Sequence, residues 1–145
     1  MFVIMFCEVI FYMDSKLFKL YDLAIENEIS LYEFDCIDKA MIIKCDDNYA
    51  IALDMLSIKS EIAEKEILAH ELGHFFTDAL YDFNTPLTNI AKNELRAEKW
   101  AIKALISKSE YLAAKKNTRN IFELAEELSL SIETVIKADN LYCTA

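Results

Sequence analysis

The chain has 145 residues, of which 54% are hydrophobic, so it can bury an apolar core and is not expected to be disordered. Its formal net charge of −10 opposes binding to nucleic-acid phosphates, because affinity for phosphates comes mainly from Lys and Arg. One glycine and one proline are too few for the turns of a many-stranded barrel or sandwich, which favours a mainly helical protein.

The first 12 residues are apolar, but Glu8 interrupts them and they are shorter than the roughly 20 residues that cross a bilayer. They also lack the basic start and the cleavage site of a signal peptide. Asp14 and Ser15 are suitable N-cap residues for a helix, so Met13 is as reasonable a natural start as Met1, and residues 1–12 are given no role. The four cysteines form no C-x-x-C pair and suggest reduced thiols in a cytoplasmic protein.

The first half of the chain predicts one helix followed by a small sheet. Apolar residues recur at helical spacing over 15–28. Three short runs rich in β-branched and aromatic residues follow, over 30–34, 40–45 and 49–55. Two Asp residues and an Asn at 46–48 tolerate turn conformations and predict a hairpin between the last two strands.

The second half predicts helices only. A helix is expected over 60–81, and the sole proline, Pro86, then marks a loop that reverses the chain into a second helix over 88–107. A polar break, KKNTRN, precedes two short helices within 118–142. The predicted fold class is α+β, with a single domain over 1–145.

The candidate chemistry lies in the first of these helices, at His70-Glu71-Leu72-Gly73-His74. This H-E-x-x-H motif uses the only two histidines in the chain. Residues four apart share a helix face, so both imidazoles can bind one zinc ion. Glu71 is rotated by about 100° from His70, which suits a general base beside the metal better than a ligand.

A catalytic zinc site needs a third protein ligand, and Glu94 is the candidate. It lies in the next predicted helix, where Ala97 and Ala101 would allow that helix to pack closely on the motif helix. Metal-bound histidines usually donate their second nitrogen to a carboxylate or a carbonyl, for which Glu98 and Asp78 are candidates. A tyrosine could stabilise the transition state, but the sequence does not choose among seven.

These residues resemble the ImmA/IrrE family of metallopeptidases. ILAHELGHFF at 67–76 and NELRAEKWAIKALI at 93–106 are similar to that family's paired motifs. The resemblance implies a small zincin-like domain, zinc ligands at His70, His74 and Glu94, and a catalytic role for Glu71. Ser107 stands where the family often has proline, and Glu98 where it often has Asn or Asp.

The resemblance also implies a substrate, because members cleave, or relieve repression by, a helix-turn-helix repressor of a phage or mobile element. An exposed edge strand such as 49–54 would hold such a peptide by strand addition. The alternative is a non-enzymatic zinc protein that binds or sequesters the repressor. The spacing of the two C-terminal helices resembles a helix-turn-helix. Residues 119–142 carry two basic and five acidic side chains, however, and this negative balance opposes DNA binding. The oligomeric state is left open.

Overall fold

The computed structural model describes residues 14–35, 39–82 and 84–144, so the predictions for residues 1–12 lie outside the described part. The elements follow in chain order: α2 (Ser15–Glu26), β1 (Ile29–Glu33), β2 (Ala40–Cys45), β3 (Asn48–Leu53), α3 (Glu61–Phe76), α4 (Leu87–Leu105), α5 (Lys108–Asn117), α6 (Ile121–Leu128) and α7 (Ile132–Cys143). Helices and one small sheet therefore make an α+β fold, as predicted from the sequence.

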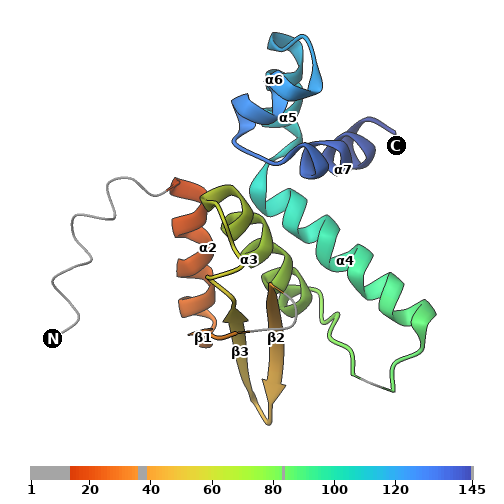
Figure 1. Cartoon of the computed structure of the whole chain (residues 1–145). Coiled ribbons are helices and arrows are strands. Elements are labelled where there is room, and N and C mark those ends of the chain that lie inside the picture. The colour runs from red at the N-terminus through yellow and green to blue at the C-terminus, as the bar shows by residue number, and fades with distance from the viewer. Residues whose placement is uncertain (1–13, 36–38, 83, 145) are drawn as a thin grey trace, which may run out of the picture.

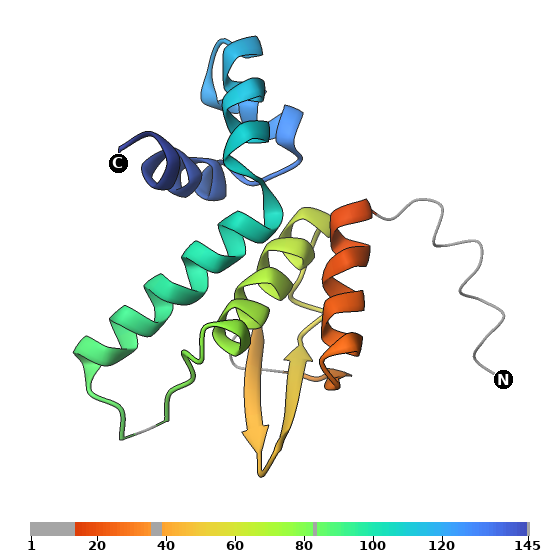
Figure 2. The same cartoon turned by 180° about the vertical axis from the view of Figure 1, so that it is seen from behind.

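The helices are arranged around α3. Figures 1 and 2 show α3 between α2 and α4, with the sheet packed below α2 and α3 and with α5, α6 and α7 gathered at the end of α4 that lies away from the sheet. One cluster of buried side chains includes residues of every described helix and strand except β2, from Leu17 in α2 to Tyr142 in α7. The motif helix is thus held from several sides.

The sheet has the strand order β1-β3-β2. β3 pairs with β1 in parallel and with β2 antiparallel, so the hairpin predicted between β2 and β3 is present. Its turn contains Asp46, which adopts the left-handed conformation with a φ of 55°. The suggestion that 49–54 is an exposed edge strand was wrong, because this segment is β3, the central strand. The edge strand that contacts α3 is β2.

Three helices end earlier than predicted, and the first is α2, which ends at Glu26 and not at Glu28. α3 ends at Phe76 and not near Tyr81, because Asp78 adopts a left-handed conformation with a φ of 49°. α4 ends at Leu105, and Ser107, the predicted last residue, is instead the N-cap of a separate helix, α5. Ser107 and Glu110 form a capping box there, a signal that was present in the sequence.

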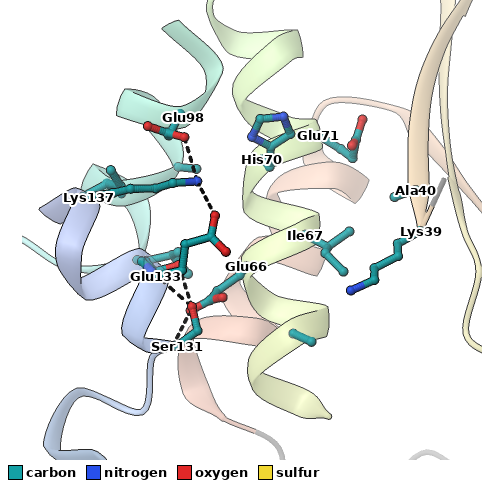
Figure 3. Close-up of a pocket in the computed structure, with 15 residues that line it drawn as sticks. Lys39, Ala40, Glu66, Ile67, His70, Glu71, Glu98, Ser131, Glu133 and Lys137 are labelled. Carbon is teal, nitrogen blue, oxygen red and sulfur yellow. Dashed lines mark hydrogen bonds and ion pairs between the residues drawn. The ribbon is translucent and has the colours of Figure 1, made fainter. Parts of the chain in front are cut away.

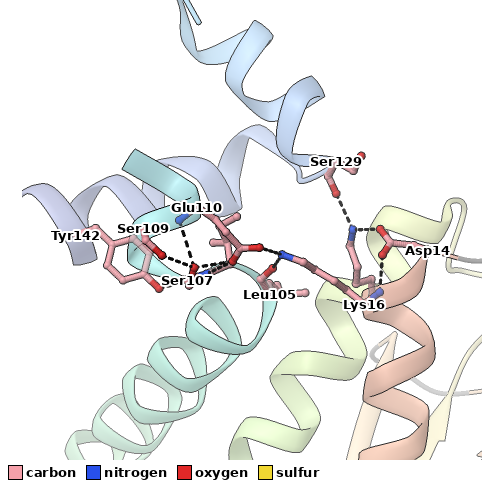
Figure 4. A network of polar contacts seen from close by, with 10 residues as sticks. Asp14, Lys16, Leu105, Ser107, Ser109, Glu110, Ser129 and Tyr142 are labelled. Atoms are coloured by element: carbon pink, nitrogen blue, oxygen red, sulfur yellow. Dashed lines mark hydrogen bonds and ion pairs between the residues drawn. The ribbon is translucent and has the colours of Figure 1, made fainter. Parts of the chain in front are cut away.

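The C-terminal helices are fastened to α3 by two neighbouring side chains. Lys65 is 1% exposed, and its ammonium group donates hydrogen bonds to the Ser129 carbonyl and to Asp14 at the N-cap of α2. Glu66 accepts a hydrogen bond from the backbone N–H of Ser131, the N-cap of α7. Figure 4 shows Asp14 and Ser129 on either side of this ammonium group. The connection between α6 and α7 is therefore anchored one turn before His70.

The backbones of α3 and α4 approach each other closely at Gly73. A Cβ atom added to Gly73 would lie 2.4 Å from the carbonyl oxygen of Ala97 and 3.0 Å from its Cα atom. Ala97 is fully buried at this crossing. Glycine is required here because the obstructing atoms belong to the backbone and cannot move aside as a side chain would.

Gly73→Ala should therefore destabilise the protein by about 1–3 kcal/mol, as expected for overpacking. Helix propensity alone predicts the opposite, a gain of about 1 kcal/mol. Urea unfolding measures the difference, with Lys99→Ala on the exposed side of α4 as a control expected to stay within about 0.5 kcal/mol. A Gly73→Ala protein more stable than the wild type would contradict the close helix contact.

Candidate metal centre and active site

Three predicted side chains from two helices converge on one point. His70 and His74 lie one turn apart on α3, and Glu94 reaches them from α4. His70 Nε2 is 3.1 Å from Glu94 Oε2 and 3.1 Å from His74 Nε2, and His74 Nε2 is 3.3 Å from Glu94 Oε1. The ligand atoms of all three lie within 4.8 Å of one another, so this group can hold a metal ion.

The separations suit a tetrahedral ion, because ligands 2.0–2.1 Å from zinc lie about 3.4 Å from each other. The hydrogen bond of the His74 ring also suits a metal. Its Nδ1 lies 3.0 Å from the Ala79 carbonyl oxygen, which can only accept, so Nδ1 carries the proton and Nε2 has a lone pair in the neutral ring. Burial, and then the neighbouring His74, lower the pKa of His70, whereas Glu94 acts against them. The neutral imidazole that metals bind is therefore favoured.

The turn at the end of α3 supplies the hydrogen-bond partner of His74 Nδ1. Asp78 N–H donates to the Phe75 carbonyl and Ala79 N–H donates to the His74 carbonyl, which is the Schellman arrangement with Asp78 in the left-handed position. This turn brings the Ala79 carbonyl to the His74 ring. The acceptor for His74 Nδ1 is thus a backbone oxygen and not the candidate carboxylate of Asp78, and a sequence motif does not reveal a backbone acceptor.

Glu98, the other candidate partner, forms an ion pair with Lys137 of α7 at 2.8 Å. Its negative charge still acts on His70, raising that pKa slightly against the effect of burial. Lys137 also pairs with Glu133 at 2.9 Å, so one lysine joins α4 to α7 beside the cluster. Figure 3 shows this chain of charges next to His70.

A cleft of about 550 Å³ adjoins the cluster. His70 and Glu71 line it from α3, Ala40 borders it from the start of β2, and Lys137 borders it from α7. Glu71 is only 8% exposed, and Figure 3 shows it leaving α3 on the side that faces Ala40. The carboxylate predicted to be a general base therefore lies beside the metal-binding group and faces the cleft, where a substrate can reach it.

The chain matches the sequence profile of the IrrE N-terminal-like domain of peptidase family M78 over residues 41–138, more than half of its length. The protein belongs to peptidase family M78. This match confirms the ImmA/IrrE resemblance. Membership in M78 supports a function of the peptidase class. No curated protein and no solved structure gives a significant match.

The M78 match begins within β2 and ends within α7, so it spans the motif helix, Glu94 and the C-terminal helices. It thus covers all residues that line the cleft except Lys39 and Ala40. No helix among the described residues is both long and apolar enough to cross a bilayer.

Asp78→Gly tests whether Asp78 acts through its left-handed backbone conformation or through its carboxylate. Glycine adopts the left-handed conformation without strain, so the free energy of unfolding should change by less than about 1 kcal/mol and metal content should stay the same. Asp78→Val, a β-branched residue in the same conformation, should destabilise by more than about 1 kcal/mol. Thermal melting and elemental analysis measure both effects. Loss of metal in a folded Asp78→Gly protein would assign the orientation of His74 to the carboxylate.

Proposed function

We propose that this chain is a zinc-dependent endopeptidase that cleaves a protein substrate. The observation that carries the proposal is the convergence of His70, His74 and Glu94 beside a nearly buried Glu71 at one end of a cleft. Two neutral imidazoles and one carboxylate are a typical ligand set of catalytic zinc, which keeps a further position open. A structural site would have no use for a general base beside it, which weighs against the alternative of a purely binding protein.

His70, His74 and Glu94 would hold the zinc ion, and Glu71 would perform the proton transfers. When bound, zinc lowers the pKa of a water molecule and polarises a peptide carbonyl. Glu71 accepts a proton from the attacking water and then delivers it to the departing amine. The low exposure of Glu71 favours this role, because a carboxylate shielded from bulk water exchanges its proton with the reactants and not with solvent.

The substrate binds as an extended peptide along the edge of β2. Within the described residues β2 pairs only with β3, so its other edge has backbone groups available for an added strand. Ala40, the first residue of β2, borders the same cleft as His70 and Glu71. A peptide on this edge would pass the metal and place alternate side chains in the cleft, which has apolar groups of Ile67, Ile102 and Leu105 in its wall.

The proposed substrate is a helix-turn-helix repressor of a phage or mobile element, and the proposed location is the cytoplasm, where such repressors bind DNA. This part of the proposal rests on the family resemblance. The charge of −10 is consistent with a protein that acts on the repressor and not on its operator.

Glu71→Gln should lower the rate of repressor cleavage by at least about 100-fold, because it removes the general base and preserves the shape of the side chain. The purified repressor encoded beside this chain's gene is the probe, with gel electrophoresis and mass spectrometry as the readout. Glu64→Gln, on α3 but hydrogen-bonded to Tyr21, is the matched control and should keep its activity. Cleavage of casein but not of the repressor would support endopeptidase activity and would reject the repressor as its substrate. Repression relieved equally well by Glu71→Gln would instead favour the sequestering protein.

Elemental analysis tests the ligand set. The wild-type chain should carry about one zinc ion, and both His70→Ala and Glu94→Ala should lose it, because two remaining ligands hold zinc too weakly. Glu98→Gln is the control from the same helix and should keep zinc. A folded wild type without metal would reject the zinc enzyme, and zinc retained in Glu94→Ala would require another third ligand.

A further inference from the structure

The cleft beside the metal-binding group continues along α3 toward the beginning of that helix. His70 and Glu71 line it first, and the lining continues through residues one and two turns earlier: Ile67, Glu66 and Ala63. Residues three, four and seven apart share a helix face, so these side chains form one continuous strip. The rise from Glu66 to His70 is about 6 Å, which is comparable to the length of an extended lysine or arginine side chain.

The part of the cleft between these two residues has an apolar wall. Ile67 lines it from α3, and Ala101, Ile102 and Leu105 line it from α4. The three α4 residues are buried members of the core cluster, so this wall is closely packed behind its surface. Such a wall suits the methylene groups of a long side chain, which bury along apolar surface while the charged end seeks a polar partner.

Glu66 supplies a polar partner on the α7 side of the cleft. Its side chain is half-buried, and Figure 3 shows it extending from α3 toward Ser131. One carboxylate oxygen, Oε1, accepts a hydrogen bond from the Ser131 N–H at 2.6 Å. Within the described part of the chain, Glu66 has no other hydrogen bond and no ion pair. The second oxygen, Oε2, is therefore available to a substrate.

The charges around Glu66 favour a cation. The residues that line the cleft carry four carboxylates and two ammonium groups. Lys137 is already paired with Glu98 and Glu133, and Lys39 borders the cleft from the side of β2. The hydrogen bond from Lys137, and to a smaller extent the charge of Lys39, lower the pKa of Glu133. Both ammonium groups thus act on Glu133, and neither forms an ion pair with Glu66.

We propose that Glu66 selects peptides with a lysine or arginine beside the scissile bond, a role that rests on the proposed endopeptidase function. The methylene groups of this side chain lie along Ile67, Ile102 and Leu105, and its cationic end donates a hydrogen bond to Glu66 Oε2. A hydrogen bond between two charged groups is stronger than a neutral one. Proteins that bind DNA are rich in lysine and arginine, so the proposed substrate offers such sites. Glu66 determines specificity and takes no part in breaking the bond.

Paired fluorogenic peptides test the preference. They share the sequence around a cut site mapped in casein and carry arginine or citrulline, its uncharged isostere, on one side of the cut bond and then on the other. We expect kcat/KM of the wild type to be about tenfold higher for arginine on one side. Glu66→Gln should lose this preference and cleave the citrulline peptide as fast as the wild type, because glutamine still accepts from the Ser131 N–H. Zinc content and melting temperature should not change.

Two variants separate Glu66 from a general effect of negative charge. Glu64→Gln, on the same helix but hydrogen-bonded to Tyr21, should keep the preference. Glu133→Gln should lower it by less than about twofold, because this side chain is 77% exposed and paired with a lysine. An equal loss in Glu133→Gln and Glu66→Gln would overturn the proposal, as would a Glu66→Gln enzyme that still prefers arginine.

Glu66→Asp decides if Glu66→Gln does not fold. Its carboxylate is one methylene group further from the substrate, so the preference should move from arginine to homoarginine, and an unchanged preference for arginine would overturn the role of Glu66. The outcome for the proposed function is separate. A wild type that hydrolyses no protein would reject the endopeptidase and this selectivity with it, whereas an active wild type without a preference for arginine rejects the selectivity alone.

Discussion

The contact between the backbones of α3 and α4 at Gly73 and Ala97 is the constraint on which the proposed active site depends. Glu94 has a short side chain, so it can share an ion with His70 and His74 only if its helix lies almost against theirs. The absence of a side chain at Gly73 permits that distance, since a Cβ atom there would overlap the Ala97 carbonyl. The glycine inside the motif therefore affects the position of the proposed ligand Glu94, 21 positions further along the chain.

The turn that ends α3 has two consequences for the site. Because Asp78 adopts the left-handed conformation, the chain reverses and its next residue, Ala79, meets the His74 ring with its carbonyl oxygen. The same reversal carries Tyr81 back to the face of His74. A helix that continued to Tyr81 would have pointed these groups along its axis and away from the cluster. The orientation of the His74 ring, a proposed ligand, thus follows from one backbone conformation.

The C-terminal helices form one wall of the cleft. Lys65 and Glu66 hold the connection between α6 and α7 on α3, and Lys137 joins α7 to Glu98 of α4 close to His70. Lys65 is buried together with its charge, which is tolerated because Asp14 and the Ser129 carbonyl both accept from it. The cleft thereby has charged groups at its rim and apolar groups in its wall, an arrangement suited to a peptide with side chains of both kinds.

The sequence by itself determined the motif helix, the identity of the converging residues and the fold class. Two histidines four apart must share a helix face, and a proline loop followed by Glu94 and two alanines predicts a second helix able to pack closely. It also contained the Ser107–Glu110 capping box that begins α5, although the helix over 108–117 was not predicted. Only the tertiary structure decided the central position of β3 and the backbone acceptor of His74. Strand order depends on contacts between distant segments, a backbone carbonyl carries no sequence signal, and a non-glycine residue such as Asp78 gives only a weak indication of a left-handed turn.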